Sequence, residues 1–160
     1  MTAGLFNKPN EGTVVVHDID GNTKEIAIKE LKFRISVYGI LPNGNKVLAQ
    51  WNPTINRHFL PGGGVDLGEK LEGALIREFQ EETGFTVKII KLLDVKEDFF
   101  AFGKEYAHSV LIFYQVEKVS GELLEESNGD DSDRAEFVTV KELEKEGLQS
   151  QYIEILNMVI

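Results

Sequence analysis

The sequence predicts an α+β fold in which one central helix lies between two groups of β-strands. Residues 71–83 repeat apolar side chains at helical spacing. Runs rich in β-branched residues precede this segment, and apolar runs typical of strands follow it. Helical patterns at 141–146 and 151–160 end the chain. Because strands and helices do not alternate regularly, an α+β or a three-layer arrangement is favoured over repeated βαβ units.

The strands expected before the central helix are joined by short turns. Residues 13–18 and 23–28 flank an Asp-Gly-Asn turn and predict an N-terminal β-hairpin. Residues 31–41 and 46–51 flank an Asn-Gly turn and predict the next two strands. The hairpin either caps the main domain or pairs with a second subunit to form a homodimer.

The second half of the chain predicts a further group of strands and one acidic loop. The expected strands are 87–95 (with helix as the alternative), 98–102, 107–116 and 136–140. The run at 107–116 is apolar on both faces, which is typical of a central buried strand. Residues 120–134 are polar and acidic and are expected to form a loop.

Length and composition indicate a single domain over 1–160, with residues 13–28 as its β-hairpin extension. No apolar run approaches the roughly 20 residues that span a bilayer, so no membrane partner is expected. The N-terminal 12 residues lack the basic and apolar parts of a secretory signal. Cysteine is absent, which removes disulfides and thiolate chemistry. We therefore expect a cytoplasmic protein.

The formal net charge of -10 restricts the class of partner. An acidic surface repels polyanions, so a nucleic acid polymer is not expected as a partner. A small phosphorylated ligand remains compatible with this charge, because a divalent cation held by carboxylates reverses the local field.

Glutamates concentrate in the central helix, next to its apolar stripe. At 100° per residue, Leu71, Leu75 and Phe79 form one face, and Glu82 projects between the two leucines. Glu78 lies one turn before Glu82, and two carboxylates at this spacing repel each other. A carboxylate on a core-facing stripe is costly unless it is paired. A bound divalent cation would relieve this cost; the alternative is an ordinary solvated acidic face.

The segment before the helix is rich in glycine. Residues 62–64 are all glycine, which permits a backbone path that directs a carbonyl toward the carboxylates; the alternative is a plain tight turn. Arg77 lies four residues before Glu81 and can offset its charge. Oxygen ligands without cysteine favour Mg²⁺, or Mn²⁺, over zinc.

Together these residues resemble a known motif. Gly63, five residues, Glu69, seven residues and then REFQEETGF at 77–85 is similar to the Nudix box at every defining position. The resemblance implies an α/β/α sandwich with a central mixed β-sheet, flanked by the box helix and the C-terminal helices. It also implies Mg²⁺- or Mn²⁺-dependent hydrolysis of a phosphoanhydride bond in a nucleoside diphosphate linked to another moiety. The expected substrate is therefore a nucleotide-type small molecule.

The resemblance further implies roles for individual residues. The catalytic set is Glu69, Arg77, Glu78, Glu81 and Glu82. The metal ligands are Glu78, Glu81 and Glu82 with the carbonyl of Gly63, while Arg77 orients the carboxylates and Glu69 braces the loop. The general base is either a box glutamate or an acid of the later loop, and these loop acids are otherwise a solvated surface. The loop candidates are Glu125, Glu126, Asp131 and Asp133.

Residues outside the box should determine which substrate is bound. Arg57 is a candidate phosphate contact and Phe59 a candidate stacking platform for a base; the alternatives are a surface arginine and a core aromatic. No proline occurs in 86–160, which disfavours the ADP-ribose branch of the family, and the lack of cysteine disfavours the isopentenyl diphosphate isomerase branch. The competing function is a catalytically idle Nudix-like module that senses a nucleotide or binds a partner. A plain structural protein would leave Glu82 unexplained.

Overall fold

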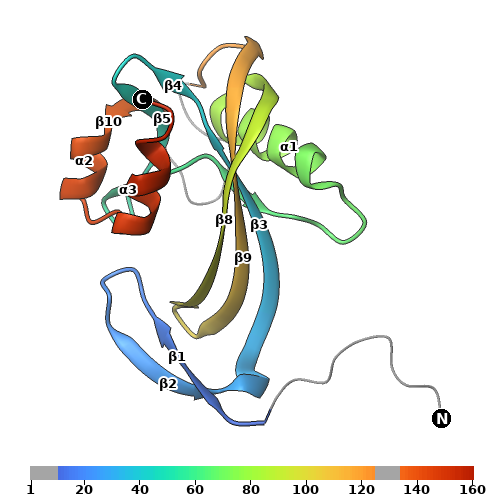
Figure 1. The fold of residues 1–160 in the computed structure, drawn as a ribbon, viewed down its shortest axis with the longest axis vertical. Helices are drawn as coiled ribbons and strands as arrows, with labels where there is room; N and C mark the ends of the chain where they lie inside the picture. The colour runs from blue at the N-terminus through green and yellow to red at the C-terminus, as the bar shows by residue number, and fades with distance from the viewer. Residues whose placement is uncertain (1–10, 125–133) are drawn as a thin grey trace. The chain divides into compact units, whose positions relative to one another are not determined.

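A computed structural model describes residues 11–124 and 134–160 (Figure 1). The strands are β1 (Thr13–His17), β2 (Thr23–Ala27), β3 (Leu31–Ile40), β4 (Pro42–Asn43), β5 (Lys46–Asn52), β6 (Arg57–Phe59), β7 (Gly62–Gly64), β8 (Thr86–Phe102), β9 (Glu105–Ser120) and β10 (Arg134–Thr139). The helices are η1 (Ile28–Glu30, a 3₁₀ turn), α1 (Leu71–Thr83), α2 (Val140–Lys145) and α3 (Ser150–Leu156). This content confirms the predicted α+β class.

The described chain divides into two compact units. The first contains the described residues up to Arg34 together with Glu97–Ser109. The second contains Ile35–Lys96 and Val110–Ile160. The expectation that 1–160 is one domain, with residues 13–28 as an extension, stays a prediction.

In the first unit, β1 and β2 pair antiparallel, from Thr13 opposite Ala27 to His17 opposite Thr23. The Asp18 carboxylate closes the turn between them by accepting hydrogen bonds from the backbone N–H groups at positions 20 and 22. β1 also pairs parallel with β8 at one position, where His17 lies opposite Phe100. The sheet is therefore mixed, as predicted.

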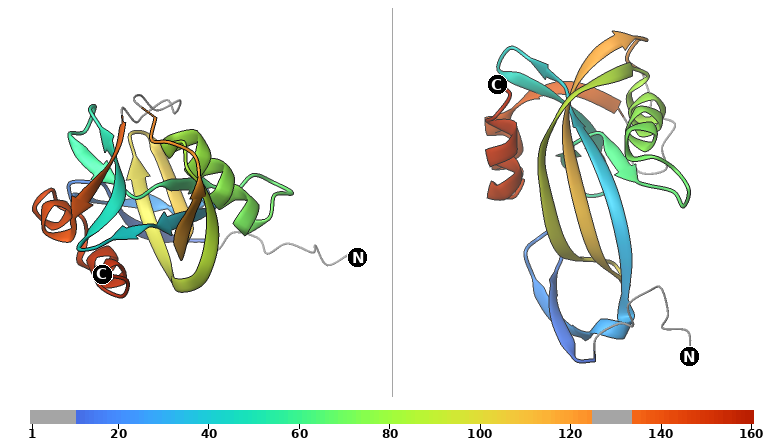
Figure 2. Two further views of the ribbon diagram at one scale, coloured as in Figure 1. Left: turned by 90° about the horizontal axis from the view of Figure 1, so that it is seen from above. Right: turned by 45° about the vertical axis from the view of Figure 1, so that its right-hand side comes forward.

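The second unit has helices on both sides of its strands (Figures 1 and 2). One sheet carries the order β8-β9-β3-β7, and the other carries β10-β5-β4 with β6 paired to β5. α1 covers one side of these strands, while α2 and α3 lie on the other. This arrangement is the sandwich that the sequence predicts.

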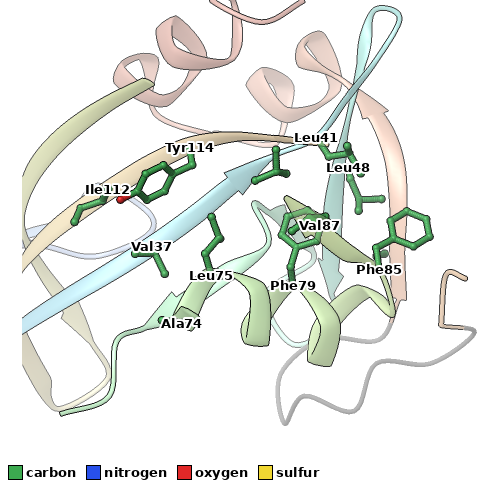
Figure 3. Packing of buried hydrophobic residues seen from close by; sticks show 12 residues of the cluster. Val37, Leu41, Leu48, Ala74, Leu75, Phe79, Phe85, Val87, Ile112 and Tyr114 are labelled. Atoms are coloured by element: carbon green, nitrogen blue, oxygen red, sulfur yellow. The ribbon is translucent and has the colours of Figure 1, made fainter. Parts of the chain in front are cut away.

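Strand β5 separates two apolar clusters, because alternate residues of a strand point to opposite faces. Leu48 packs with Leu75 and Phe79 of α1, in the cluster that Figure 3 shows. Its neighbours Val47 and Ala49 belong to the cluster formed with α2 and α3. By the same alternation, Gln50 faces α1.

Helix α1 has the predicted bounds of 71–83. Its N-cap, Lys70, makes no side-chain capping bond. Its C-terminal end is fixed by Gly84, which has φ 80°. A Cβ at Gly84 would lie 2.2 Å from the carbonyl oxygen of Glu122, so both the conformation and the space require glycine.

Several element bounds differ from the predictions. The strands expected at 87–95 and 98–102 are one continuous β8, and the polar residues between them lie on exposed or partly exposed positions of that strand. The helix expected over 151–160 ends at Leu156. β6 and β7 lie between the strand expected at 46–51 and the helix expected at 71–83, where no strand was predicted, since three residues are too few to show a period.

No helix in the described ranges is both long and apolar enough to cross a membrane.

Candidate active site

The predicted site lies in the second unit, where the last turns of α1 approach the glycine strand β7. Glu78, Glu81 and Glu82 all project from this end of α1. Glu81 is exposed, whereas Glu78 and Glu82 are partly buried. The structure therefore separates one solvent-facing carboxylate from two that face the protein.

The glycines of β7 allow the backbone to approach the carboxylates closely. Gly62 has φ 142°, and a Cβ there would lie 2.1 Å from the carbonyl oxygen of Val37 on β3. Only glycine fits this position, and its N–H donates to Glu82 Oε2 at 2.8 Å. A Cβ at Gly63 would lie 2.7 Å from the carboxyl carbon of Glu78. The strand thus leaves room for both carboxylates at its edge.

Arg77 connects the loop before α1 to the acidic end of the helix. Its Nε and Nη2 donate to the two oxygens of Glu69, each at 2.9 Å. Its Nη1 donates to Glu78 Oε1 at 2.8 Å and to Glu81 Oε2 at 3.3 Å. The sequence analysis paired Arg77 with Glu81; that contact exists, but the shorter contacts are those to Glu69 and Glu78.

The charges in this network shift the pKa values of its members. The two hydrogen bonds from Arg77 hold the pKa of Glu69 below its usual range. The same contacts, first those to Glu69 and then those to Glu78, raise the pKa of Arg77 above its ordinary value. Arg77 therefore remains a cation, and Glu69 remains ionised next to it.

Glu82 lies apart from the arginine and is held by neutral donors. Burial raises its pKa to about 8, and the charges of Glu78 and Glu81 act in the same direction. The Gly62 N–H and the Gln50 side chain oppose this shift, because both donate hydrogen bonds to Glu82 Oε2. In the absence of a cation, the Glu82 carboxyl group accordingly binds a proton at neutral pH.

Two residues at this site were missed by the sequence analysis. Gly62 was grouped with its neighbours, and Gln50 was treated only as part of a strand. Gln50 is 5% exposed, and its side chain reaches Glu82. A signal for it existed, because a lone amide in the apolar run 47–51 on the same face as Leu48 requires a buried partner.

The remaining candidates lie outside α1 and β7, although Phe59 lies opposite Gln50 in the β5–β6 pair. Arg57 and Phe59 are both on β6; the Arg57 guanidinium lies beside Gly147, after α2, and Phe59 is partly exposed. The candidate general bases Glu125, Glu126, Asp131 and Asp133 lie outside the described residues.

The chemistry of the donor set fits a hard divalent cation. Within the described ranges, no three acidic or imidazole side chains already converge as a ligand set. Glu78 instead turns toward Arg77, and Glu82 turns toward Gln50 and Gly62. Two observations support the fit of these residues to such a cation. The backbone of Gly63 approaches the Glu78 carboxylate closely, and carboxylate and carbonyl oxygens are ligands that suit Mg²⁺ or Mn²⁺.

Comparison with known proteins relates this chain to one family. A family model described as "NUDIX domain" matches residues 32–158. An ADP-ribose pyrophosphatase of Methanocaldococcus jannaschii is 35% identical over 114 residues, which cover 69% of this chain and 64% of that protein. An 8-oxo-dGTP diphosphatase of Escherichia coli is 33% identical over 96 residues, covering 57% of this chain and 70% of that protein.

A solved structure shows the same fold. The MutT NUDIX hydrolase from Burkholderia pseudomallei superposes with a TM-score of 0.65 at 24% identity, covering 81% of this chain and 99% of that chain. The family model over residues 32–158 confirms the expectation of a Nudix-type hydrolase at the level of the family. The chain belongs to the NUDIX family.

Proposed function

We propose that this chain is a metal-dependent pyrophosphohydrolase that cleaves a phosphoanhydride bond in a nucleoside diphosphate linked to another moiety. The observation that carries the proposal is the paired arrangement of Glu78 and Glu82 at the edge of the glycine strand. Glu78 is held by an arginine, while Glu82 is partly buried without a cationic partner among the described residues. A partly buried carboxylate of this kind is costly to maintain, which supports a functional role.

Each residue of the network has a distinct proposed task. Arg77 orients Glu78 through Nη1 and is itself fixed by the two-point contact with Glu69. Glu69 also accepts a hydrogen bond from the backbone N–H of Asp66 at 3.2 Å, so it braces the loop that leads into α1. Glu78, Glu81, Glu82 and the Gly63 carbonyl would hold the cation.

A bound Mg²⁺ or Mn²⁺ would neutralise the diphosphate and lower the pKa of an attacking water. The Glu82 carboxyl group, whose pKa is raised to about 8, must lose its proton before it can act as a ligand. Cation uptake should therefore strengthen as the pH rises toward 8 and level off above it. For this reason the activity is best sought at alkaline pH.

The relatives define the first substrates to test. The two curated relatives are named for ADP-ribose and for 8-oxo-dGTP. The absence of proline from 86–160 disfavours ADP-ribose as the substrate. The 35% identity to an ADP-ribose pyrophosphatase nevertheless favours including ADP-ribose among the compounds tested. Both compounds, with nucleotide sugars and dinucleoside polyphosphates, form a suitable panel.

The test is release of a nucleoside monophosphate from this panel, measured by chromatography with Mg²⁺ and with Mn²⁺ at pH 8 to 9. We expect turnover of at least one compound, and a loss by orders of magnitude in Glu82→Gln purified in the same way. An inactive parent across the whole panel would favour the idle sensing or binding module instead. An active Glu82→Gln variant would overturn the assignment of Glu82 as a metal ligand.

A further inference from the structure

Gln50 is a buried amide on β5, a strand that is paired on both of its edges. β5 is paired on one side with β6, where Gln50 lies opposite Phe59, and on the other with β10, where it lies opposite Ala135. The side chain is 5% exposed and lies on the α1 face of the strand. Its backbone position is therefore fixed from both sides, and its amide has little freedom to turn toward solvent.

The amide is directed at Glu82. Gln50 Nε2 donates to Glu82 Oε2, and the Gly62 N–H donates to the same oxygen at 2.8 Å. In the ranges that the structure describes, both hydrogen bonds to Glu82 end on Oε2. Two donors from two different strands fix the carboxylate plane and leave Oε1 as the oxygen available to a ligand.

The chemistry of these donors differs from that around Glu78. Arg77 neutralises the charge of Glu78 as it orients it. Gln50 and Gly62 are neutral donors, so they orient Glu82 without cancelling its negative charge. Once a cation has displaced the Glu82 proton, no cationic side chain among the described residues competes with it for this carboxylate.

We propose that Gln50 is a positioning residue for Glu82, which sets one oxygen of this carboxylate for a divalent cation. The inference rests on the proposed function, because it takes Glu82 as a metal ligand. If the Gln50 amide were purely structural, its hydrogen bond to Glu82 would serve only to pair a buried polar group. Its loss would then change the free energy of unfolding without changing cation affinity. Residues that orient metal ligands from the outer shell instead affect metal affinity directly.

The test is Mn²⁺ binding to the metal-free protein, followed by electron paramagnetic resonance of free Mn²⁺ or by calorimetry, with no substrate present. The main variant is Gln50→Met, which keeps the length of the side chain and removes the donor. Gln115→Met on β9 is the matched control, since Gln115 is half-buried in the same unit and alternates with Tyr114 and Val116 of the α1 cluster. Glu82→Gln marks the loss expected when the ligand itself is removed.

We expect Gln50→Met to weaken Mn²⁺ binding by about 10- to 100-fold, and the control to bind as the parent does. If Gln50→Met does not fold, Gln50→Leu carries the same test, because it also removes the N–H donor and adds neither a charge nor a metal ligand. Parental affinity in the Gln50 variant, together with lost affinity in Glu82→Gln, would overturn the positioning role while the metal site stands. Parental affinity in both would overturn the positioning role and the metal assignment together.

Discussion

Replacing Glu82 with glutamine is expected to stabilise the metal-free protein at alkaline pH. Burial and the neighbouring carboxylates raise the pKa of Glu82 from 4.5 to about 8. Between these values the folded chain binds a proton at this group more tightly than the unfolded chain does. The free energy of unfolding therefore falls as the pH rises from about 4.5 to about 8, and the loss is complete above pH 8.

The size of this effect follows from the pKa. Each unit of pKa corresponds to about 1.4 kcal/mol, so a change from 4.5 to about 8 disfavours the ionised form by about 5 kcal/mol. Solvent reaches part of the Glu82 side chain and reduces this cost to about 2–3 kcal/mol. Glu82→Gln removes the charge and keeps an oxygen that can accept from the Gly62 N–H. For a chain of this size, the melting temperature at pH 8.5 should rise by about 4–12 °C.

The measurement is thermal unfolding of parent and variant in a chelator, at several pH values from 5 to 9. The two proteins should have similar stability near pH 5 and diverge steadily up to pH 8. Mn²⁺ at about 1,000 times its Kd should reverse the order, because a cation that binds the folded state then stabilises the parent by about 4.1 kcal/mol, which exceeds the cost of about 2–3 kcal/mol. If parent and variant have equal melting temperatures without metal at pH 8.5 as well as at pH 5, the reasoning is refuted. That result would show that ionising Glu82 does not destabilise the folded protein.

Four further substitutions, one of them a control in α1, test the same site and one distant cap. Gly63→Ala should weaken Mn²⁺ binding in calorimetry, because the added Cβ would lie 2.7 Å from the Glu78 carboxyl carbon. Gly73→Ala is the control, since a Cβ added there meets nothing within 4 Å. It should keep the Mn²⁺ affinity of the parent and stabilise α1 by about 0.5–1 kcal/mol. Arg77→Lys should lower kcat by about 10- to 100-fold with the fold intact by circular dichroism, because an ammonium cannot replace the two-point contact. Thr139→Ala should cost about 1 kcal/mol in chemical unfolding and leave Mn²⁺ affinity unchanged, because it removes the cap of α2.

The sequence was informative wherever a periodic pattern decided the structure. Helix α1 has the predicted bounds, because its apolar spacing is regular and Gly84 ends it in the left-handed conformation. The placement of Glu82 next to Leu75 also followed from the 100° step, and the structure finds that glutamate partly buried. Local pattern was sufficient in both cases, since neighbours in space are neighbours on one helix.

The sequence was uninformative where the partner is far away along the chain. β7 is three glycines whose strand conformation depends on pairing with Ser36, Val37 and Tyr38 of β3. Nothing local indicates that pairing. Gln50 reaches Glu82 across 32 residues, so no spacing rule could connect the two. Patterns along one element therefore located the two partly buried glutamates, while contacts between elements determined how they are held.

The two glutamates at the centre of the site are held by opposite means, and this difference bears on what the site can do. Glu78 has a guanidinium partner and resembles an ordinary ion pair, which needs nothing further to be stable. Glu82 has only neutral donors, and its burial raises its pKa to about 8. A sequence selected for stability alone would place a neutral side chain there, since that removes the cost. An ionisable group is of use there if a divalent cation takes the place of its proton. The metal-free stability of Glu82→Gln and the Mn²⁺ affinity of Gln50→Met therefore test one idea from two directions.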